Sequence, residues 1–199
     1  LATVTFDGLT ATPAWVDIQT AVYSAASVLG TNTVDTIDTA GLIVLPLVFL
    51  TVYFCFSWAI RQLSGETVPV QEVARAFVFS LVPIALAYNM AHFISLLLIQ
   101  GQGIVPLASD PFGFGWDLFG TADYRLNIAV INAKIVWYLS VAAIVLGHIM
   151  SVYIAHVISI RRAPDHSSAL RGQYPMLLLM VGYTATSLWI IAQPIVAEG

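Results

Sequence analysis

Charged side chains are scarce in this sequence. Of its 199 residues only 9% are charged, seven of them basic and eleven acidic, whereas a soluble globular domain carries roughly 25%. Hydrophobic residues make up 59% of the chain, and the mean hydropathy is +0.87. So few charges cannot cover the surface of a water-soluble protein of this size. The composition therefore excludes a soluble globular protein.

Cysteine is nearly missing as well, since the one cysteine, Cys55, lies inside an apolar run. This excludes an internal disulfide framework and any cysteine-rich zinc or iron–sulfur site. Seven basic residues are too few to neutralise a phosphate backbone, so no nucleic-acid partner is expected. The sequence also lacks Gly-x-Ser-x-Gly, His-Glu-x-x-His and phosphate-loop motifs, so no common catalytic motif indicates a reaction.

The sequence does contain four apolar runs that are long enough to cross a bilayer. They cover residues 39–60, 76–99, 128–160 and 175–196, and each meets the requirement of about 20 residues for a transmembrane helix. The predicted fold is therefore an all-α membrane protein, with a four-helix transmembrane domain over residues 39–199 that is surrounded by lipid.

Basic residues predict the orientation of these spans. Arg61 and Arg75 flank the connection between the first two spans, and Arg161, Arg162 and Arg171 flank the connection between the last two. The opposite ends carry mainly aspartates. By the positive-inside rule, both termini and the loop over residues 100–127 are expected outside the cell.

The N-terminal segment, residues 1–38, is expected to be external and to contain a short interfacial helix. Pro13, Ala14 and Trp15 open a stretch that continues over residues 16–29 and is too polar to span a membrane. An external segment has to be translocated, yet the chain begins without a leader-like sequence. We therefore expect further helices upstream, in a larger polytopic protein, or a cleaved signal sequence.

The external loop over residues 100–127 is rich in glycine and aromatic residues. Phe112, Phe114, Trp116 and Phe119 are typical of side chains that anchor at a membrane interface. The prediction is a cap that folds back over the helix bundle. The alternative is a lid that closes an external cavity over His92.

Polar residues inside the spans form stripes. At 100° per residue, Lys134, Tyr138, His148 and His156 fall within an arc of about 80° on the third span, so all four are expected to face protein rather than lipid. Similar stripes lie on the second and fourth spans. The simplest interpretation is that these polar residues form hydrogen bonds between neighbouring helices. The residues of these two stripes are Tyr88, Asn89, His92 and Ser95 on the second span, and Tyr183, Thr186, Ser187 and Gln193 on the fourth.

The histidines also allow a functional interpretation, because intramembrane imidazoles mark ligand sites and proton paths. His92 and His148 are candidate ligands of a haem b, although their depths differ. His92 and Asn89 are candidate ligands of a metal ion, together with a carboxylate of the external loop. His92 is the residue that we expect to contact a ligand, ion or cofactor, if the chain binds one.

Several short motifs along the chain are similar to those of one known family. They are Phe6-Asp7-Gly8-Leu9, Thr12-Pro13 with Trp15, Ala87-Tyr88, Ala91-His92, Gln100-Gly101-Gln102, Ser109-Asp110-Pro111-Phe112-Gly113, Gly147-His148 and Ala155-His156. The chain resembles the C-terminal half of bacterial polytopic membrane proteins labelled fenitrothion hydrolase. This resemblance covers most of the chain and implies additional N-terminal spans, a bacterial inner-membrane location with periplasmic termini, and cleavage of an organophosphate ester. It implies no particular catalytic residues.

Three functions therefore stay open at the level of sequence, besides a transporter, for which the four spans show no inverted repeat. The first is a part of a larger polytopic protein, or a subunit of a membrane complex, whose inward-facing polar stripes host an ion, a proton path or a cofactor. The second is a membrane-bound organophosphate hydrolase, for which the chain shows fewer metal ligands than activation of a water molecule requires. The third is a haem-binding electron-transfer subunit.

Overall fold

A computed structural model describes residues 1–25 and 33–197 of the chain, and the residues it describes form helices and no strand. The elements in chain order are α1 (Ala2–Thr10), α2 (Pro13–Ala25), α3 (Thr33–Ser64), α4 (Val70–Phe77), the 3₁₀ helix η2 (Val78–Leu81), α5 (Val82–Ile99), the 3₁₀ helix η3 (Gln100–Gly103), α6 (Ile104–Ser109), α7 (Ala133–Arg162) and α8 (His166–Ala197).

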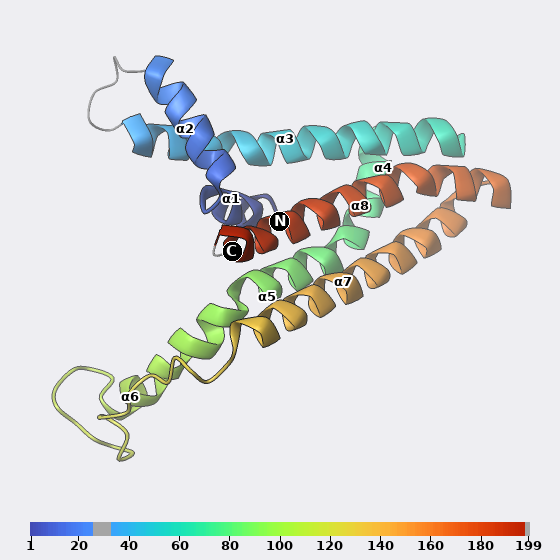
Figure 1. Cartoon of the computed structure of the whole chain (residues 1–199). Coiled ribbons are helices and arrows are strands. Elements are labelled where there is room, and N and C mark those ends of the chain that lie inside the picture. The colour runs from blue at the N-terminus through green and yellow to red at the C-terminus, as the bar shows by residue number, and fades with distance from the viewer. Residues whose placement is uncertain (26–32, 198–199) are drawn as a thin grey trace.

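Four long helices form the body of the protein. Helix α5 packs against α7, α7 against α8, and α8 against α3, so the spatial order is α5, α7, α8, α3 (Figure 1). The short helices close the two ends of this row: α4 packs against α3 at one end, and α1 packs against α3, α5 and α8 at the other. Both chain termini lie at the α1 end (Figure 1).

Three helical segments among the described residues are long and apolar enough to cross a membrane: Thr33–Ser64, Val70–Ser109 and Ala133–Arg162. The predicted all-α class is thereby confirmed, and these three helices are compatible with the predicted membrane protein. Helix α8 is an unbroken helix of 32 residues between α3 and α7. Its predicted role as a fourth span stays a prediction.

The second predicted span has different ends in the structure. Helix begins at Val70 rather than at residue 76, narrows to 3₁₀ geometry before Pro83 in the first turn of α5, and continues beyond residue 99 as far as Ser109. The apolar run ends at residue 99, so the sequence predicts a loop from residue 100. The chain stays helical, and the side-chain amide of Gln102 donates to the Leu98 carbonyl at 2.8 Å.

The third span begins later than predicted, at Ala133 instead of residue 128. Asn132 is the N-cap of α7, because its side-chain oxygen accepts a hydrogen bond from the backbone N–H of Lys134 at 2.8 Å. Such a cap favours a helix start at this position. The apolar residues 128–131 therefore belong to the preceding loop.

The N-terminal segment holds two helices rather than one. Helix α1 was not predicted, and the predicted interfacial helix is α2, which begins at Pro13; part of its predicted C-terminal half lies outside the described residues. Trp15 does not face lipid, since only 7% of it is exposed. Its indole N–H donates to Asp38 at 2.9 Å, and its ring meets Phe6 edge-on at 5.1 Å. These contacts fasten the segment to α3.

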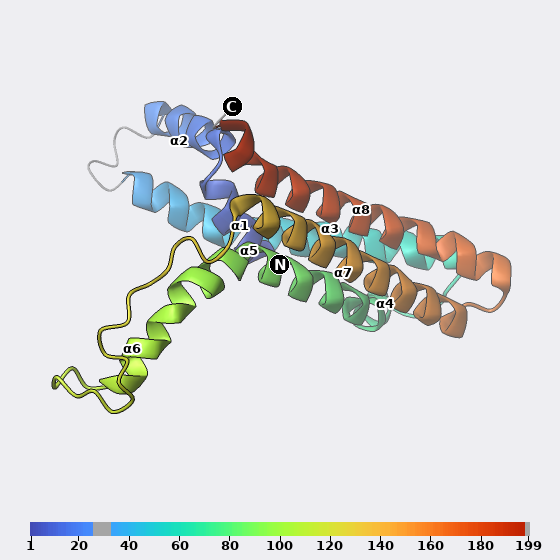
Figure 2. The same cartoon turned by 60° about the horizontal axis from the view of Figure 1, so that its bottom comes forward.

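The loop predicted as a cap or lid has another position. Residues 100–132, which we call the arm, extend away from the helix bundle in both views (Figures 1 and 2). Asp110 holds the tip of the arm by accepting hydrogen bonds from the backbone N–H groups of Phe114 at 2.9 Å and Gly115 at 2.8 Å. The prediction of a cap over the bundle, and of a lid over His92, is therefore wrong.

Helix α7 packs through small residues. Gly147 lies so close to α5 that an added Cβ would come within 2.4 Å of the Ala87 Cβ. Ser140 donates to the Ala91 carbonyl at 3.1 Å, and Ser151 accepts from the Ile84 N–H at 3.1 Å. Small side chains allow helices in membranes to approach closely and to form hydrogen bonds between them. The buried residues of this face are Ser140, Ile144, Gly147, Ser151, Ala155 and Ser159.

Only part of the polar stripe of α7 packs against the described residues of this chain. Lys134 is exposed, and Tyr138 is 55% exposed. His148 and His156 are half-buried and contact α8. The stripe lies beside the small-residue face rather than on it, so its members reach a neighbouring helix only where α8 runs close to α7.

Candidate functional site

A hydrogen bond between two side chains links the N-terminal segment to α5. His92 Nε2 lies 2.7 Å from the Asp7 Oδ2, with the His92 side chain 19% exposed and that of Asp7 64% exposed. With Asp7 ionised, the carboxylate accepts the Nε2 proton, which leaves Nδ1 of a neutral ring as a hydrogen-bond acceptor. A carboxylate partner fixes both the tautomer and the orientation of an imidazole. His92 is thus held in a defined position near the surface.

Gly8 allows α1 to come close enough for this pair to form. A Cβ on Gly8 would lie 2.6 Å from Ile190 Cγ2, 3.6 Å from the Tyr88 hydroxyl and 3.7 Å from His92 Cε1. A larger residue would push α1 away from α5 and α8. The carboxylate of the neighbouring Asp7 would then move away from the imidazole.

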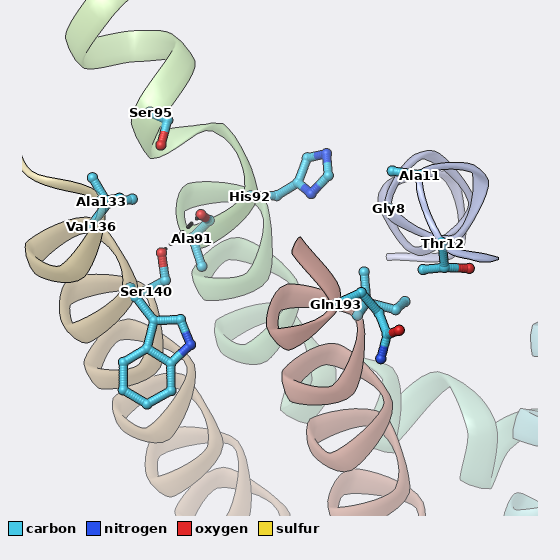
Figure 3. A pocket seen from close by; sticks show the side chains of 12 residues that line it. Gly8, Ala11, Thr12, Ala91, His92, Ser95, Ala133, Val136, Ser140 and Gln193 are labelled. Atoms are coloured by element: carbon cyan, nitrogen blue, oxygen red, sulfur yellow. Dashed lines mark hydrogen bonds between the residues drawn. The ribbon is translucent and has the colours of Figure 1, made fainter. Parts of the chain in front are cut away.

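His92 lies on the wall of a pocket of about 310 Å³. The pocket is formed where α1, α5, α7 and α8 meet, at the end of the bundle that carries both termini (Figure 3). Most of its lining is apolar or small, and polar atoms come from a few side chains. The lining residues are Gly8, Ala11, Thr12, Ala91, His92, Ser95, Ala133, Val136, Trp137, Ser140, Ile190 and Gln193.

Tyr88 lies one helical turn before His92 and is completely buried, and the centroids of the two rings are 6.4 Å apart. Its hydroxyl is near the side chains of Thr5 and Ser187. Among the described residues, however, no group satisfies hydrogen-bond geometry with this hydroxyl. A buried hydroxyl without a partner costs about 1–3 kcal/mol. The Tyr88 hydroxyl, which lies behind the pocket wall and is not part of the lining, therefore has an unused capacity for hydrogen bonding.

The structure does not bring His92 and His148 together. The first turns of α7 lie beside His92, because Ser140 contacts the Ala91 carbonyl. His148 follows Ser140 by eight residues on α7, which separates the two by about 12 Å along the helix axis. Thr184 donates to the Met180 carbonyl at 2.9 Å and accepts from His148 Nδ1 at 3.0 Å. This geometry does not favour a haem held by both histidines.

The proposed metal ligands are also separate. The Asn89 side-chain amide donates to the Ala85 carbonyl of its own helix at 2.9 Å. The carboxylate that meets His92 is Asp7 and not an aspartate of the arm, where Asp110 and Asp117 bind backbone N–H groups. Within residues 1–25 and 33–197, no group of three or more histidine, cysteine, aspartate or glutamate side chains is arranged to hold a metal ion.

His156, the last member of the predicted stripe, lies at the other end of the bundle. Its Nδ1 donates to the Gln173 Oε1 at 2.8 Å. Nearby, Arg162 pairs with Glu66 at 2.7 Å, which ties the end of α7 to the connection after α3. These contacts join neighbouring helices, as the structural interpretation of polar intramembrane residues predicts.

Sequence reasoning found His92 but missed Asp7 and Gly8 as its neighbours. The sequence places Asp7 among the external acidic residues and in the motif Phe6-Asp7-Gly8-Leu9, but neither feature predicts a contact with His92. The available signal was an acidic residue followed by glycine inside an apolar stretch, residues 1–9, that was not recognised as a helix. Comparison of the chain with protein-family models, with curated proteins and with solved structures found no match in any of the three.

Proposed function

We propose that this chain is part of an integral membrane protein that binds a small molecule in the pocket beside His92. The single observation that carries the proposal is the position of His92, which is oriented by Asp7 at 2.7 Å and lines a pocket of about 310 Å³. Small-molecule sites are typically concave and mostly apolar, with a few well-placed polar groups. Fixed polar groups in such pockets select the orientation of the ligand.

The proposal includes a membrane arrangement of four spans, with α8 as the fourth. Helix α8 lies between α3 and α7, both of which are long and apolar enough to cross a membrane. The pocket end is external and the arginine-rich end cytoplasmic, by the positive-inside rule. In the arm, Phe112, Phe114 and Phe119 are more than two-thirds exposed, and we assign them to the external membrane interface.

Additional transmembrane helices, from the same protein or from another subunit, belong to this arrangement. Asp7 is 64% exposed at the level of His92 on α5. Tyr138 is 55% exposed, and Lys134, one turn earlier on α7, is exposed as well. Polar groups within membrane helices face protein or water rather than lipid. We therefore propose that partner helices cover the side of α7 that carries Lys134 and Tyr138, and that Asp7 faces water.

A screen of fluorinated aromatic fragments by ¹⁹F NMR, with the protein in nanodiscs, tests the binding function. We expect fragments that bind the wild-type protein to lose binding in Ala133→Phe, because Ala133 lines the pocket and is exposed, so the larger ring occupies the pocket without entering the core. Ala142→Phe is the matched control, since Ala142 is an exposed residue of the same helix that does not line the pocket.

His92→Gln is the second arm of this test. Fragments with a polar group are expected to bind more weakly, by roughly tenfold for the loss of one hydrogen bond of about 1.4 kcal/mol. His148→Gln, on the surface between α7 and α8, is expected to leave binding unchanged. Equal fragment binding by the wild-type and Ala133→Phe proteins would show that the pocket is not the binding site.

A second candidate function is hydrolysis of an organophosphate ester, as the sequence resemblance implies. The observation that favours it is the same pair, because a carboxylate that orients an imidazole is the arrangement of a general base. His92 would accept a proton from a water molecule that attacks phosphorus. Release of 4-nitrophenolate from diethyl 4-nitrophenyl phosphate measures this reaction; turnover that is absent, or unchanged in His92→Gln, contradicts it.

A further inference from the structure

We infer that the molecule bound beside His92 is a small organic cation, an amine with an apolar body. This inference rests on the proposed binding function and adds the chemical class of the ligand. It is derived from the charges at the pocket, from the composition of its wall and from the distribution of charge over the molecule.

The first step concerns charge at the site. Asp7 does not itself line the pocket, but it brings one negative charge to within 2.7 Å of the ring of His92, which does. Neither lysine nor arginine is among the lining residues. Lys134 follows a lining residue in the chain but is exposed and is not part of the lining. The only positive charge that can offset Asp7 within the pair is a second proton on His92. A cationic ligand supplies such a charge from outside.

The second step concerns the hydrogen-bonding groups. When Asp7 accepts the Nε2 proton of neutral His92, Nδ1 has a free lone pair. The second oxygen of Asp7 has no ion-pair partner among the described residues. While the His92 ring is neutral, both groups accept hydrogen bonds and neither donates one. They are complementary to a ligand that donates several protons, which an alkylammonium group does.

The third step concerns the body of the ligand. Ala11, Ala91, Val136 and Ile190 give the pocket apolar surfaces, and Trp137 contributes an indole ring. Cations are attracted to the faces of indole rings. A volume of about 310 Å³ accommodates a single aromatic ring with a short side chain.

The fourth step concerns the approach of the ligand. The aspartates of α2, of the start of α3 and of the arm lie at the same end of the molecule as the pocket (Figure 1). They are Asp17, Asp35, Asp38, Asp110, Asp117 and Asp123, whereas five of the seven basic residues lie at or near the opposite ends of the long helices. Such an asymmetric field raises the local concentration of cations near the pocket.

A pair of probes of nearly equal shape tests the inference: 2-phenylethylamine, which is a cation, and 2-phenylethanol, which is neutral. Binding to the protein in nanodiscs is measured by isothermal titration calorimetry. We expect the amine to bind about tenfold more tightly than the alcohol, as a charge-assisted hydrogen bond is stronger than a neutral one. Asp7→Asn is expected to abolish the difference, because it keeps the shape of the side chain and removes its charge.

Asp17→Asn is the matched control. It changes the net charge of the protein by the same amount, but Asp17 is an exposed residue of α2 that is not the carboxylate in contact with His92. The preference for the amine should therefore persist. Equal affinities of the wild-type protein for the two probes would overturn the inference while leaving the binding function intact. If both variants lose the preference for the amine, the preference comes from the overall negative charge of this end of the protein. The inference that Asp7 beside the pocket selects a cation would then be wrong. Binding of neither probe, together with a failed fragment screen, would overturn the binding function itself.

Discussion

Single residues decide whether the candidate site exists at all. Asp7 reaches His92 only because Gly8 lets α1 lie against α5 and α8. The same holds at Gly41, where an added Cβ would lie 2.5 Å from the Trp15 ring and 2.6 Å from the Phe6 ring. Both glycines are helical and are needed for close approach rather than for an unusual backbone conformation. The N-terminal segment is thus fitted to the bundle at two points.

Gly8→Ala is expected to destabilise the protein and to weaken the hydrogen bond between Asp7 and His92. Its Cβ would come within 2.6 Å of Ile190 Cγ2, and such overpacking typically costs about 1–3 kcal/mol. The measurement is unfolding by SDS in mixed micelles, followed by helical circular dichroism. Gly101→Ala is the control, because nothing lies within 4 Å of an added Cβ there. If both variants unfold like the wild type, close packing of α1 is not important for stability.

Asp165 is a residue whose electrostatics can be tested separately, outside the membrane spans. It precedes α8 and accepts hydrogen bonds from the Ser167 hydroxyl, from the Ser168 hydroxyl at 2.7 Å and from the Ser168 N–H at 3.0 Å. These bonds favour the carboxylate and hold the pKa of Asp165 well below its usual value. The Asp165 carboxylate is therefore the N-cap of α8.

The double variant Ser167→Ala/Ser168→Ala is expected to raise the pKa of Asp165 toward the ordinary value of about 3.9. Titration of the ¹³C-labelled carboxyl group by NMR measures it. Because folding lowers this pKa, the contribution of the cap to stability is complete above about pH 4 and is lost as the pH falls through the lowered pKa. An unchanged pKa in the double variant would mean that the serine hydroxyls do not stabilise the carboxylate.

At the scale of elements, α7 shows which parts of the structure the sequence could predict. Its length and apolar character predicted a spanning helix, and the structure has one from Ala133 to Arg162. Its polar stripe was expected to mark the buried face. The face that packs is instead the row of small residues, because contact in a membrane is limited by how closely backbones approach and not by hydrophobicity. Ser140, Gly147 and Ser151, which are seven and four residues apart and so lie along one side of the helix, were the overlooked signal.

Gly147→Ala tests the importance of this face. The added Cβ would lie 2.4 Å from the Ala87 Cβ and 2.9 Å from the Pro83 carbonyl oxygen, and backbone atoms cannot turn away as a side chain does. Helices α5 and α7 must separate, so we expect a loss of at least about 1–3 kcal/mol in SDS unfolding. Gly182→Ala on α8, where an added Cβ meets nothing within 4 Å, should be neutral or stabilising, because alanine favours helix over glycine. Similar stability of the two variants would argue against close packing at Gly147.

Helix ends and loops were less predictable than helix existence. Apolar runs define spans by the thickness of a bilayer, but the ends depend on local groups such as the Asn132 cap of α7 and the Gln102 side chain in η3. The contact between Asp7 and His92 joins residues 85 positions apart in sequence. Periodicity describes one helix at a time, so it gave His92 an inward direction without naming its partner.

At the scale of the whole molecule, charge separates the two ends of the bundle. Among the arginines at or near the connections between α3 and α4 and between α7 and α8, Arg61 donates to the Val68 carbonyl at 2.7 Å and Arg162 pairs with Glu66. Arg75, Arg161 and Arg171 are exposed. The candidate pocket lies at the far end, among the aspartates. The orientation of this charge gradient in the membrane determines which compartment supplies the ligand.

Single-cysteine labelling measures that orientation. In a Cys55→Ser background, Ala122→Cys places a thiol on the arm and His166→Cys places one at the start of α8; both positions are exposed. We expect a membrane-impermeant maleimide to label position 122 in intact bacterial cells and position 166 only in inverted vesicles, because arginine-rich connections stay in the cytoplasm. The reverse pattern would place the pocket in the cytoplasm. Labelling of both positions from one side would exclude the four-span arrangement, since the connections before α7 and α8 would then not lie on opposite sides of the membrane.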